Sequence, residues 1–192
     1  ISLPYPSDMA VDNPNLIWID CEMTGLSLER DALVEIAVLV TDAELNVLGE
    51  GIDLVINAPS ATLDAMSPEV RTMHTESGLL PLIALGVSAS TAEQKVLEYL
   101  SLHTVAGKSP LAGNSIAMDR NFIARDMPLL DKYLHYRSVD VSSIKELARR
   151  WYPKIYFESP KKNGNHRALG DIRDSIAELK YYREKIFIPS HT

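Results

Sequence analysis

The sequence predicts an α/β fold in which helices flank a mixed five-stranded sheet. Three apolar segments rich in β-branched residues come first, and two shorter apolar segments then alternate with helical patterns. The 192-residue chain is 46% hydrophobic and 23% charged, which is ordinary for a soluble globular protein. A chain of this length can bury one sizeable core, so we expect a single domain.

The first three strands are expected at residues 16–19, 31–42 and 47–57. The first, LIWI, is bounded by Pro14 and Gly25, and the second is a long apolar run. The third shows partial alternation and follows AELN, which has the composition of a turn. Three strands so closely spaced are expected to form successive hairpins.

Helices and two further strands follow. Ser67 before Pro68 is typical of a helix start, and Thr91 with Gln94 resembles a capping box for a helix that reaches about His103. The short strands are SPLAG, ending at residue 113, and RSVDV, residues 137–141. The other helices are expected at 117–127, at 144–152 behind a possible Ser143–Glu146 capping box, and at about 167–187. The last has an apolar stripe of Ile172, Ile176 and Leu179.

The N-terminal residues and the one cysteine bear on the domain boundary and on the cellular location of the protein. Residues 1–8 precede Met9, a possible native start, so we interpret them as a leader or cloning remnant and assign the domain to 9–192. The sequence has no signal peptide and no run of about 18 apolar residues, so no membrane association is expected. Cys21 is the only cysteine, which excludes an intramolecular disulfide and favours a reducing, cytoplasmic location.

The first strand leads into Asp20 and Glu22, whose side chains project to the same face of an extended chain. Paired carboxylates disfavour each other's ionisation. Either the strand has ended and both acids are solvated in a turn, or a hard divalent cation lies between them. Three later residues have ordinary explanations when taken singly. Asp119 and Asp171 fall near helix starts, where acids are favoured, and His166 precedes a helix.

The constellation is more informative than its members. D-x-E on the first strand, an Asp after a later strand and H-x4-D near the end resemble the DEDDh family of 3′-to-5′ exonucleases, which has a ribonuclease-H-like fold. The longer motifs WIDCEMTGL, LAGNSIAMDRNFI, HYRSVDVSSIKELARRWYP and HRALGDIRDSI are similar to those of the oligoribonuclease family, in order and separation, over residues 15–187. One departure is Gly170, where many relatives have an acid or alanine.

The resemblance implies a 3′-to-5′ exoribonuclease that cuts fragments of about two to five nucleotides, dinucleotides included, to 5′-mononucleotides. Asp20, Glu22, Asp119 and Asp171 would bind two divalent ions, Mg²⁺ or Mn²⁺, since hard cations prefer carboxylate oxygens. His166, with an ordinary pKa near 6.5, would deprotonate the attacking water.

The resemblance also implies how short single-stranded RNA is held. Leu26 would wedge against a base, Tyr136 would stack or act in the active site, and the 5′ phosphate would bind Ser115, Arg137 and Ser142. His74 is a weaker candidate for substrate contact. Without the family, the ordinary explanations would be preferred, with Leu26 as a loop anchor, Tyr136 as a core residue and Ser142 as a helix cap.

Family members are homodimers, and the aromatic-rich stretch at residues 149–157 is a candidate interface. The net charge of −7 argues against coating long nucleic acid, although two divalent cations would offset four of these charges. Two other readings stay open. One is another DEDDh exonuclease, such as a DNA-proofreading subunit, and the other is a non-catalytic nucleic-acid-binding protein. All four acids and the histidine are present, which disfavours the second.

Overall fold

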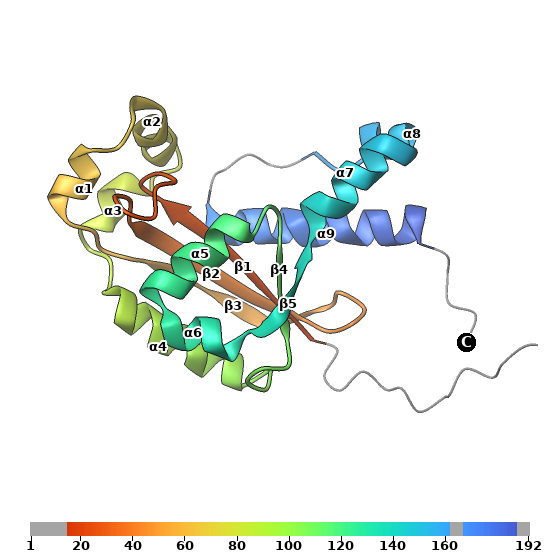
Figure 1. The fold of residues 1–192 in the computed structure, drawn as a ribbon, viewed down its shortest axis with the longest axis horizontal. Coiled ribbons are helices and arrows are strands. Elements are labelled where there is room, and N and C mark those ends of the chain that lie inside the picture. The colour runs from red at the N-terminus through yellow and green to blue at the C-terminus, as the bar shows by residue number, and fades with distance from the viewer. Residues whose placement is uncertain (1–14, 162–166, 188–192) are drawn as a thin grey trace, which may run out of the picture.

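A computed structural model describes residues 15–161 and 167–187 of the chain. Its centre is a five-stranded sheet with the order β3-β2-β1-β4-β5 (Figure 1). Helices lie on both faces of the sheet, as the sequence predicts. Two larger apolar cores, one on each face, hold the three layers together.

The three N-terminal strands form the expected antiparallel hairpins. They are β1 (Leu16–Met23), β2 (Leu33–Thr41) and β3 (Val47–Val55). The turn between β2 and β3 is set by Asp42, whose carboxylate accepts the backbone N–H groups of Glu44 and Asn46 at 2.8 Å each.

The two later strands, β4 (Pro110–Gly113) and β5 (His135–Asp140), run parallel to β1. This mixture of hairpins and parallel crossovers confirms the mixed five-stranded sheet. It brings the C-terminal ends of β1, β4 and β5 to one edge of the sheet, where sites in such folds gather.

Each face of the sheet is covered by its own helices. One face packs against α4 (Ala89–Ser101), α5 (Ala117–Asp126) and α6 (Pro128–Tyr133), and the other against α7 (Val141–Trp151) and α9 (Ala168–Ile186). The short helices are α1 (Ser60–Asp64), α2 (Pro68–Glu76), α3 (Leu80–Ile83) and α8 (Pro153–Phe157). The predicted stripe of α9 is confirmed, because Ile172, Ile176 and Leu179 are buried in the second core.

The helix starts test the capping predictions. Ser67 caps α2 by accepting the Val70 N–H, with Pro68 as the first helical residue, as expected. The two predicted capping boxes, at Thr91 and at Ser143, are wrong. Ser88 caps α4, three residues before Thr91, and Asp140 caps α7 rather than Ser143. In both cases another capping side chain stands three residues upstream, and the helix begins there.

Among the described residues, no helix is both long and apolar enough to cross a membrane.

Candidate active site

The paired acids of the first strand lie within the strand and not in a turn. β1 continues to Met23, so Asp20 pairs with Ala37 and Glu22 with Glu35 across the β1–β2 ladder. Both acids are half-buried and point to the same side of the sheet. The alternative of two solvated turn residues is therefore wrong.

Asp119 is brought to these acids by the shortness of β4. That strand ends at Gly113, and beyond its end the backbone N–H of Cys21 donates instead to Asp119 Oδ1 at 2.9 Å. Asp119 lies in the first turn of α5 and is only 7% exposed. A carboxylate favoured only by the helix dipole would face solvent, whereas this one is buried against the backbone of β1.

Asp171 reaches the same place from the first turn of α9. The carboxylates of Asp20, Glu22 and Asp171 each offer one oxygen, and these atoms lie within 4.8 Å of one another. Asp119 stands beside them through its bond to the Cys21 N–H. The structure thus brings three of the four predicted metal ligands into one cluster, and Asp119 contacts the strand at Cys21, between Asp20 and Glu22 in the sequence.

The electrostatics of this cluster fit a cation site. Burial, followed by repulsion from Glu35, Asp171 and Asp119, raises the pKa of Glu22 to about 8. Burial raises the pKa of Asp119 to about 6, although the hydrogen bond from the Cys21 N–H lowers it. Crowded hard oxygens that resist ionisation are what a divalent cation would stabilise. The acidic cluster could therefore hold a divalent cation.

Sequence reasoning missed the ion pair that joins α9 to the sheet. Glu35 on β2 is fully buried, and its Oε1 accepts from Arg167 Nε at 2.8 Å and lies 2.7 Å from Nη2. Its Oε2 accepts the Ala168 N–H at 3.1 Å. The available signal was a lone acid in an otherwise apolar strand, since such an acid is almost never fully buried without a partner.

Two of the predicted phosphate-binding residues are joined by a third residue that was not predicted. Asp140 Oδ1 accepts the Ser115 N–H at 3.0 Å, the Ser142 N–H at 2.9 Å and the Ser142 hydroxyl at 2.6 Å. Ser142 is therefore not the cap of α7, and Asp140 connects the loop after β4 to the start of α7. Ser115 itself has a left-handed backbone with φ of 56°.

Leu26 lies on the loop after β1 with 69% of its surface exposed, so it is not a buried anchor. Asp31 holds this loop, since its Oδ2 accepts the Ser27 N–H at 2.8 Å and its Oδ1 accepts the Thr24 hydroxyl at 3.3 Å. The Asp31 carboxylate passes so close to Gly25 that an added Cβ would lie 2.4 Å from it. Beside the loop is a hollow of about 340 Å³, lined by Leu26 and seven other residues.

His74 lies inside the protein and not on an accessible surface. It is fully buried in α2, and its Nε2 lies 2.8 Å from the carbonyl oxygen of Met23, the last residue of β1. A contact of His74 with substrate stays a prediction, while its observed contact fixes the end of the strand that bears Asp20 and Glu22.

Tyr136 and Arg137 lie at the opposite end of β5 from Asp140. A register shift pairs His135 with Pro110 but Ser138 with Leu111, so Tyr136 and Arg137 lie in an irregularity near the start of β5. Tyr136 is 74% exposed, so it is not a core residue, and it stacks on His135 with ring centroids 4.4 Å apart. Arg137 lies over the Tyr136 ring at 5.3 Å. This pair therefore lies away from the end of β5 at which Asp140 meets the loop after β4.

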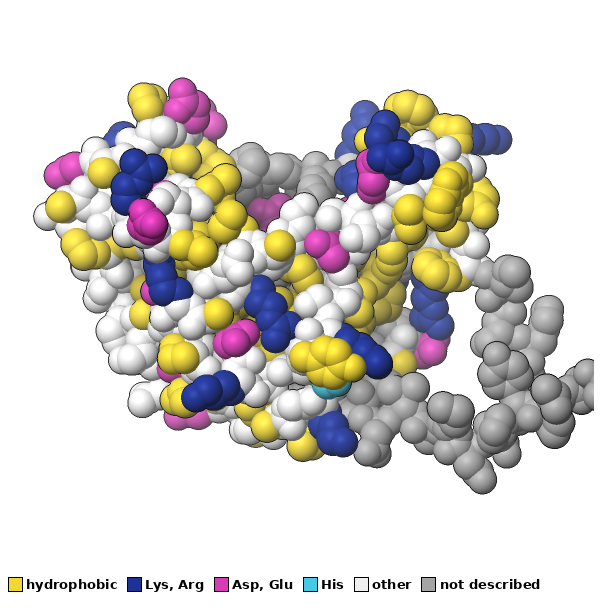
Figure 2. Space-filling model, in the orientation of Figure 1, with side chains coloured by type: hydrophobic (Ala, Val, Ile, Leu, Met, Phe, Trp, Pro, Cys, Tyr) yellow, Lys and Arg dark blue, Asp and Glu magenta, His cyan; other side chains and the backbone are white. Residues whose placement is uncertain are grey.

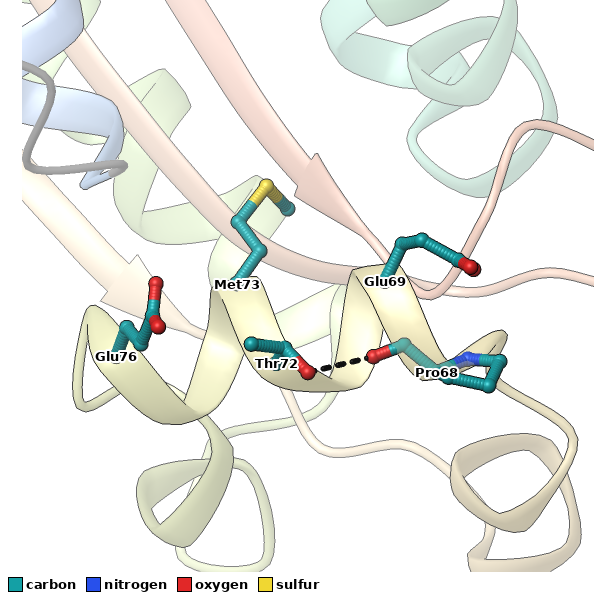
Figure 3. A pocket seen from close by; sticks show the side chains of 5 residues that line it. All are labelled: Pro68, Glu69, Thr72, Met73 and Glu76. Carbon is teal, nitrogen blue, oxygen red and sulfur yellow. Dashed lines mark hydrogen bonds between the residues drawn. The ribbon is translucent and has the colours of Figure 1, made fainter.

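His166 lies outside the described residues, so its role stays a prediction. A second hollow, of about 390 Å³, is formed entirely by side chains of α2 (Figure 3). None of the predicted site residues lines it. The carboxylate cluster, and not this hollow, is the candidate active site.

Comparison with known proteins agrees with this geometry. Residues 17–179 match the family model described as "Exonuclease". An oligoribonuclease of Streptomyces avermitilis is 64% identical over 92% of this chain and 89% of its own length. One from a Mycobacterium species is 63% identical over 90% of this chain and 81% of its own length.

The fold also resembles a solved structure. Escherichia coli exonuclease I, in complex with a 5cy-dT13 oligonucleotide, superposes with a TM-score of 0.69 at 16% identity. The match covers 91% of this chain but only 41% of that protein. This likeness confirms the ribonuclease-H-like sheet, and the sequence matches show that the chain belongs to the oligoribonuclease family of 3′-to-5′ exoribonucleases.

Proposed function

We propose that this chain hydrolyses oligoribonucleotides of about two to five nucleotides, dinucleotides included, from the 3′ end to 5′-mononucleotides. The observation that carries the proposal is the convergence of Asp20, Glu22 and Asp171 within 4.8 Å, with Asp119 beside them. The name of the 64% identical relative supports the substrate class.

The four carboxylates would hold two divalent cations, Mg²⁺ or Mn²⁺. Such ions, when bound, stabilise the attacking and leaving oxygens of a phosphodiester displacement. The chain's own contribution is to position the acids. β1 holds Asp20 and Glu22 in one ladder, and Asp119 is fixed by the Cys21 N–H. His166 would remove the proton from the attacking water.

Selection of short RNA would depend on capture of the 5′ phosphate. Ser115 and Ser142 both donate hydrogen bonds to Asp140, which lies at the C-terminal end of β5. The exposed Leu26 would wedge against a base on the other side of the carboxylates. Arg137 would add a charge-assisted contact to the phosphate, and His74 a further contact to substrate.

A homodimer would supply the residues that one chain leaves remote. Tyr136 and Arg137 are exposed at the far end of β5, so a second copy is the available route by which they reach a carboxylate cluster. The distal surface, which we define as Leu147, Trp151, Tyr152, Phe157 and Phe187, is apolar and exposed (Figure 2). Three of these residues, Trp151, Tyr152 and Phe157, belong to the predicted interface at residues 149–157. We place the enzyme in the cytoplasm, where short RNA and a reduced Cys21 are both expected.

A time course on RNAs of two to twenty nucleotides tests the proposal, with Mg²⁺ and with chelator. Dinucleotides are expected to be hydrolysed fastest, and chelator is expected to stop the reaction. Faster hydrolysis of long single-stranded DNA would favour a proofreading-type exonuclease instead, and no hydrolysis of any substrate would favour a binding protein.

Arg137→Ala isolates the proposed phosphate contact, which is worth about 1.5–3 kcal/mol. Roughly a tenfold to hundredfold loss is expected on 5′-phosphorylated dinucleotides and much less on longer RNA. A dinucleotide without the 5′ phosphate should show the same loss on wild-type protein. Equal losses at every length would contradict the cap model.

A further inference from the structure

The start of α9 is held from outside the helix. A helix leaves its first backbone N–H groups without intrahelical partners, and a capping side chain usually satisfies one of them. Among the described residues, the N-cap Arg167 makes no such bond with its own side chain. Glu35 of β2 supplies it, because its Oε2 accepts the Ala168 N–H at 3.1 Å.

The other oxygen of Glu35 holds Arg167 itself. Arg167 Nε donates to Oε1 at 2.8 Å, and Nη2 lies 2.7 Å from the same atom. Arg167 Nη2 also lies 3.7 Å from Asp53 on β3. Two neighbouring strands therefore fix this guanidinium, and Glu35 is fully buried, so the pair has little freedom to rearrange.

This anchor continues directly into the carboxylate cluster. The Arg167 carbonyl accepts the Gly170 N–H at 2.9 Å and the Asp171 N–H at 3.1 Å. Across the ladder, Glu35 is paired with Glu22. This ion pair, whose carboxylate is buried, is thus one backbone hydrogen bond away from Asp171 and one strand away from Glu22.

We propose that Glu35 and Arg167 are positioning residues of the metal centre, which set Asp171 against Asp20 and Glu22 before a cation binds. The inference rests on the proposed function, and it deepens it by naming the residues that arrange the site. Neither side chain is a proposed ligand.

A role of Arg167 as a nearby charge and a role in positioning Asp171 predict opposite effects on cation binding, so an experiment can distinguish the two roles. If Arg167 acted only as a nearby positive charge, its removal would strengthen cation binding. If it positions Asp171, its removal weakens binding. The double replacement of Glu35→Gln with Arg167→Met removes one charge of each sign, so the net charge of the site does not change. It also avoids a lone buried carboxylate, which would threaten the fold.

The test is Mn²⁺ binding to the full chain by calorimetry, without substrate. The double variant is expected to bind about tenfold to a hundredfold more weakly, the usual loss when groups that orient metal ligands are removed. Arg167→Lys, which keeps the charge but not the fork, should fall between the double variant and wild type. At saturating Mn²⁺, turnover should recover most of its wild-type value.

Two controls exclude a general loosening of α9. Glu44→Gln with Arg183→Met removes an exposed ion pair at the other end of the helix and should leave Mn²⁺ affinity unchanged. Leu179→Ala should lower the stability of α9 through its core contacts and likewise leave Mn²⁺ affinity within about twofold, since packing there is distant from the ligands.

A folded double variant that binds Mn²⁺ as tightly as wild type would overturn the inference while leaving the proposed function intact. A wild-type chain that binds no Mn²⁺ would overturn the proposed metal centre itself, and this inference with it. Equal loss of affinity in Leu179→Ala would also overturn it, because stability and not position would then control the site.

Discussion

Helix α9 begins among carboxylates and ends beside exposed aromatic side chains. At its near end, Arg167 is paired with the fully buried Glu35. At its far end, Arg183 pairs with Glu44, and these side chains are 45% and 67% exposed. A buried pair costs desolvation and holds its partners in one geometry, whereas an exposed pair contributes little. The difference agrees with the proposal that Glu35 and Arg167 position the near end of α9.

The far end of α9 lies beside the proposed dimer surface. Phe187 and Ile186 meet residues of α7 around a hollow of about 210 Å³, whose lining is mostly apolar. Trp151 is 67% exposed and Phe157 80% exposed on the same distal surface. Exposed apolar patches of this kind usually mark interaction sites. The one helix therefore connects a proposed metal ligand to a proposed dimer surface.

The largest effect is expected from a change in the carboxylate cluster at the near end of α9. Asp171→Asn removes one of the three converging carboxylates, and turnover on a dinucleotide should fall about a thousandfold or more, because metal ions supply several kcal/mol of transition-state stabilisation. Loss of one crowded charge relieves repulsion, so the melting temperature in metal-free buffer should hold or rise. Steady-state kinetics and thermal melting check both.

Glu184→Gln is the matched control, since it removes one exposed acid from the far end of the same helix. Its turnover should equal that of wild type. If Asp171→Asn retained near wild-type turnover at saturating Mg²⁺, the two-metal proposal would fail.

The next largest effect is expected from a change in the distal surface beside the far end of α9. Trp151→Ala removes the large exposed aromatic that borders the apolar hollow, and a hot-spot residue of this type contributes about 2 kcal/mol or more to association. The dimer dissociation constant should rise about thirtyfold, as measured by analytical ultracentrifugation. Activity at dilute enzyme should fall with the dimer, because Tyr136 is proposed to act across the interface.

Leu85→Ala tests a comparably exposed side chain, 83% exposed, outside the distal surface. It should not change the association. A wild-type chain that is monomeric at all concentrations would contradict the dimer and require another route to the active site for Tyr136.

A pH series tests the comparison further, because the two acids with raised pKa values belong to the site at which α9 begins. The pKa of Glu22 is raised to about 8 and that of Asp119 to about 6, so protons compete with a cation. Mn²⁺ affinity should therefore rise between pH 6 and pH 8, by up to about tenfold per pH unit for each proton released.

Without metal, the same shift acts on stability in the opposite direction. The folded state keeps the Glu22 proton to higher pH than the unfolded chain does, so the free energy of unfolding should fall as pH rises from about 4.5 to about 8. Melting in chelator across this range checks the sign. A rise in stability over the same range would show that Glu22 is already ionised in the folded chain.

The sequence predicted what is local and missed what is assembled from distant segments. Asp20 and Glu22 could be predicted to share a face because strand geometry alone puts them there. Asp119 and Asp171 came from the family resemblance, since no pattern in one sequence shows that α5 and α9 begin beside β1. Glu35 appears in the sequence only as one acid in an apolar run, and its partner lies 132 residues later.

The helix caps show the same limit at short range. Ser88 and Asp140 are close to the predicted capping boxes at Thr91 and Ser143. The predicted boxes matched a sequence pattern, whereas the observed caps have extended backbone and side chains that accept a helix N–H. Asp140 also has a role that no local pattern contains, because it accepts the Ser115 N–H from another loop. Such contacts depend on how the strands are ordered in the sheet.

The smallest expected effect concerns Gly170, the departure from the family pattern noted in the sequence. It is an exposed residue in the first turn of α9, and an added Cβ would have no described atom within 4 Å. Gly170→Ala should therefore raise the free energy of unfolding by about 0.5–1 kcal/mol, because glycine inside a helix costs backbone entropy. Chemical denaturation measures this gain. Gly25→Ala is the contrasting variant, since its Cβ would meet the Asp31 carboxylate, and it should destabilise the Leu26 loop.

Mn²⁺ affinity decides what the gain in Gly170→Ala means. If Glu35 and Arg167 already hold the near end in place, a stiffer first turn adds stability to α9 and leaves the affinity unchanged. If the affinity rises with stability, the start of the helix frays in solution, and the ion pair holds Asp171 for only part of the time. The position of Asp171 would then depend on the helix propensity of its own first turn as well as on the buried pair.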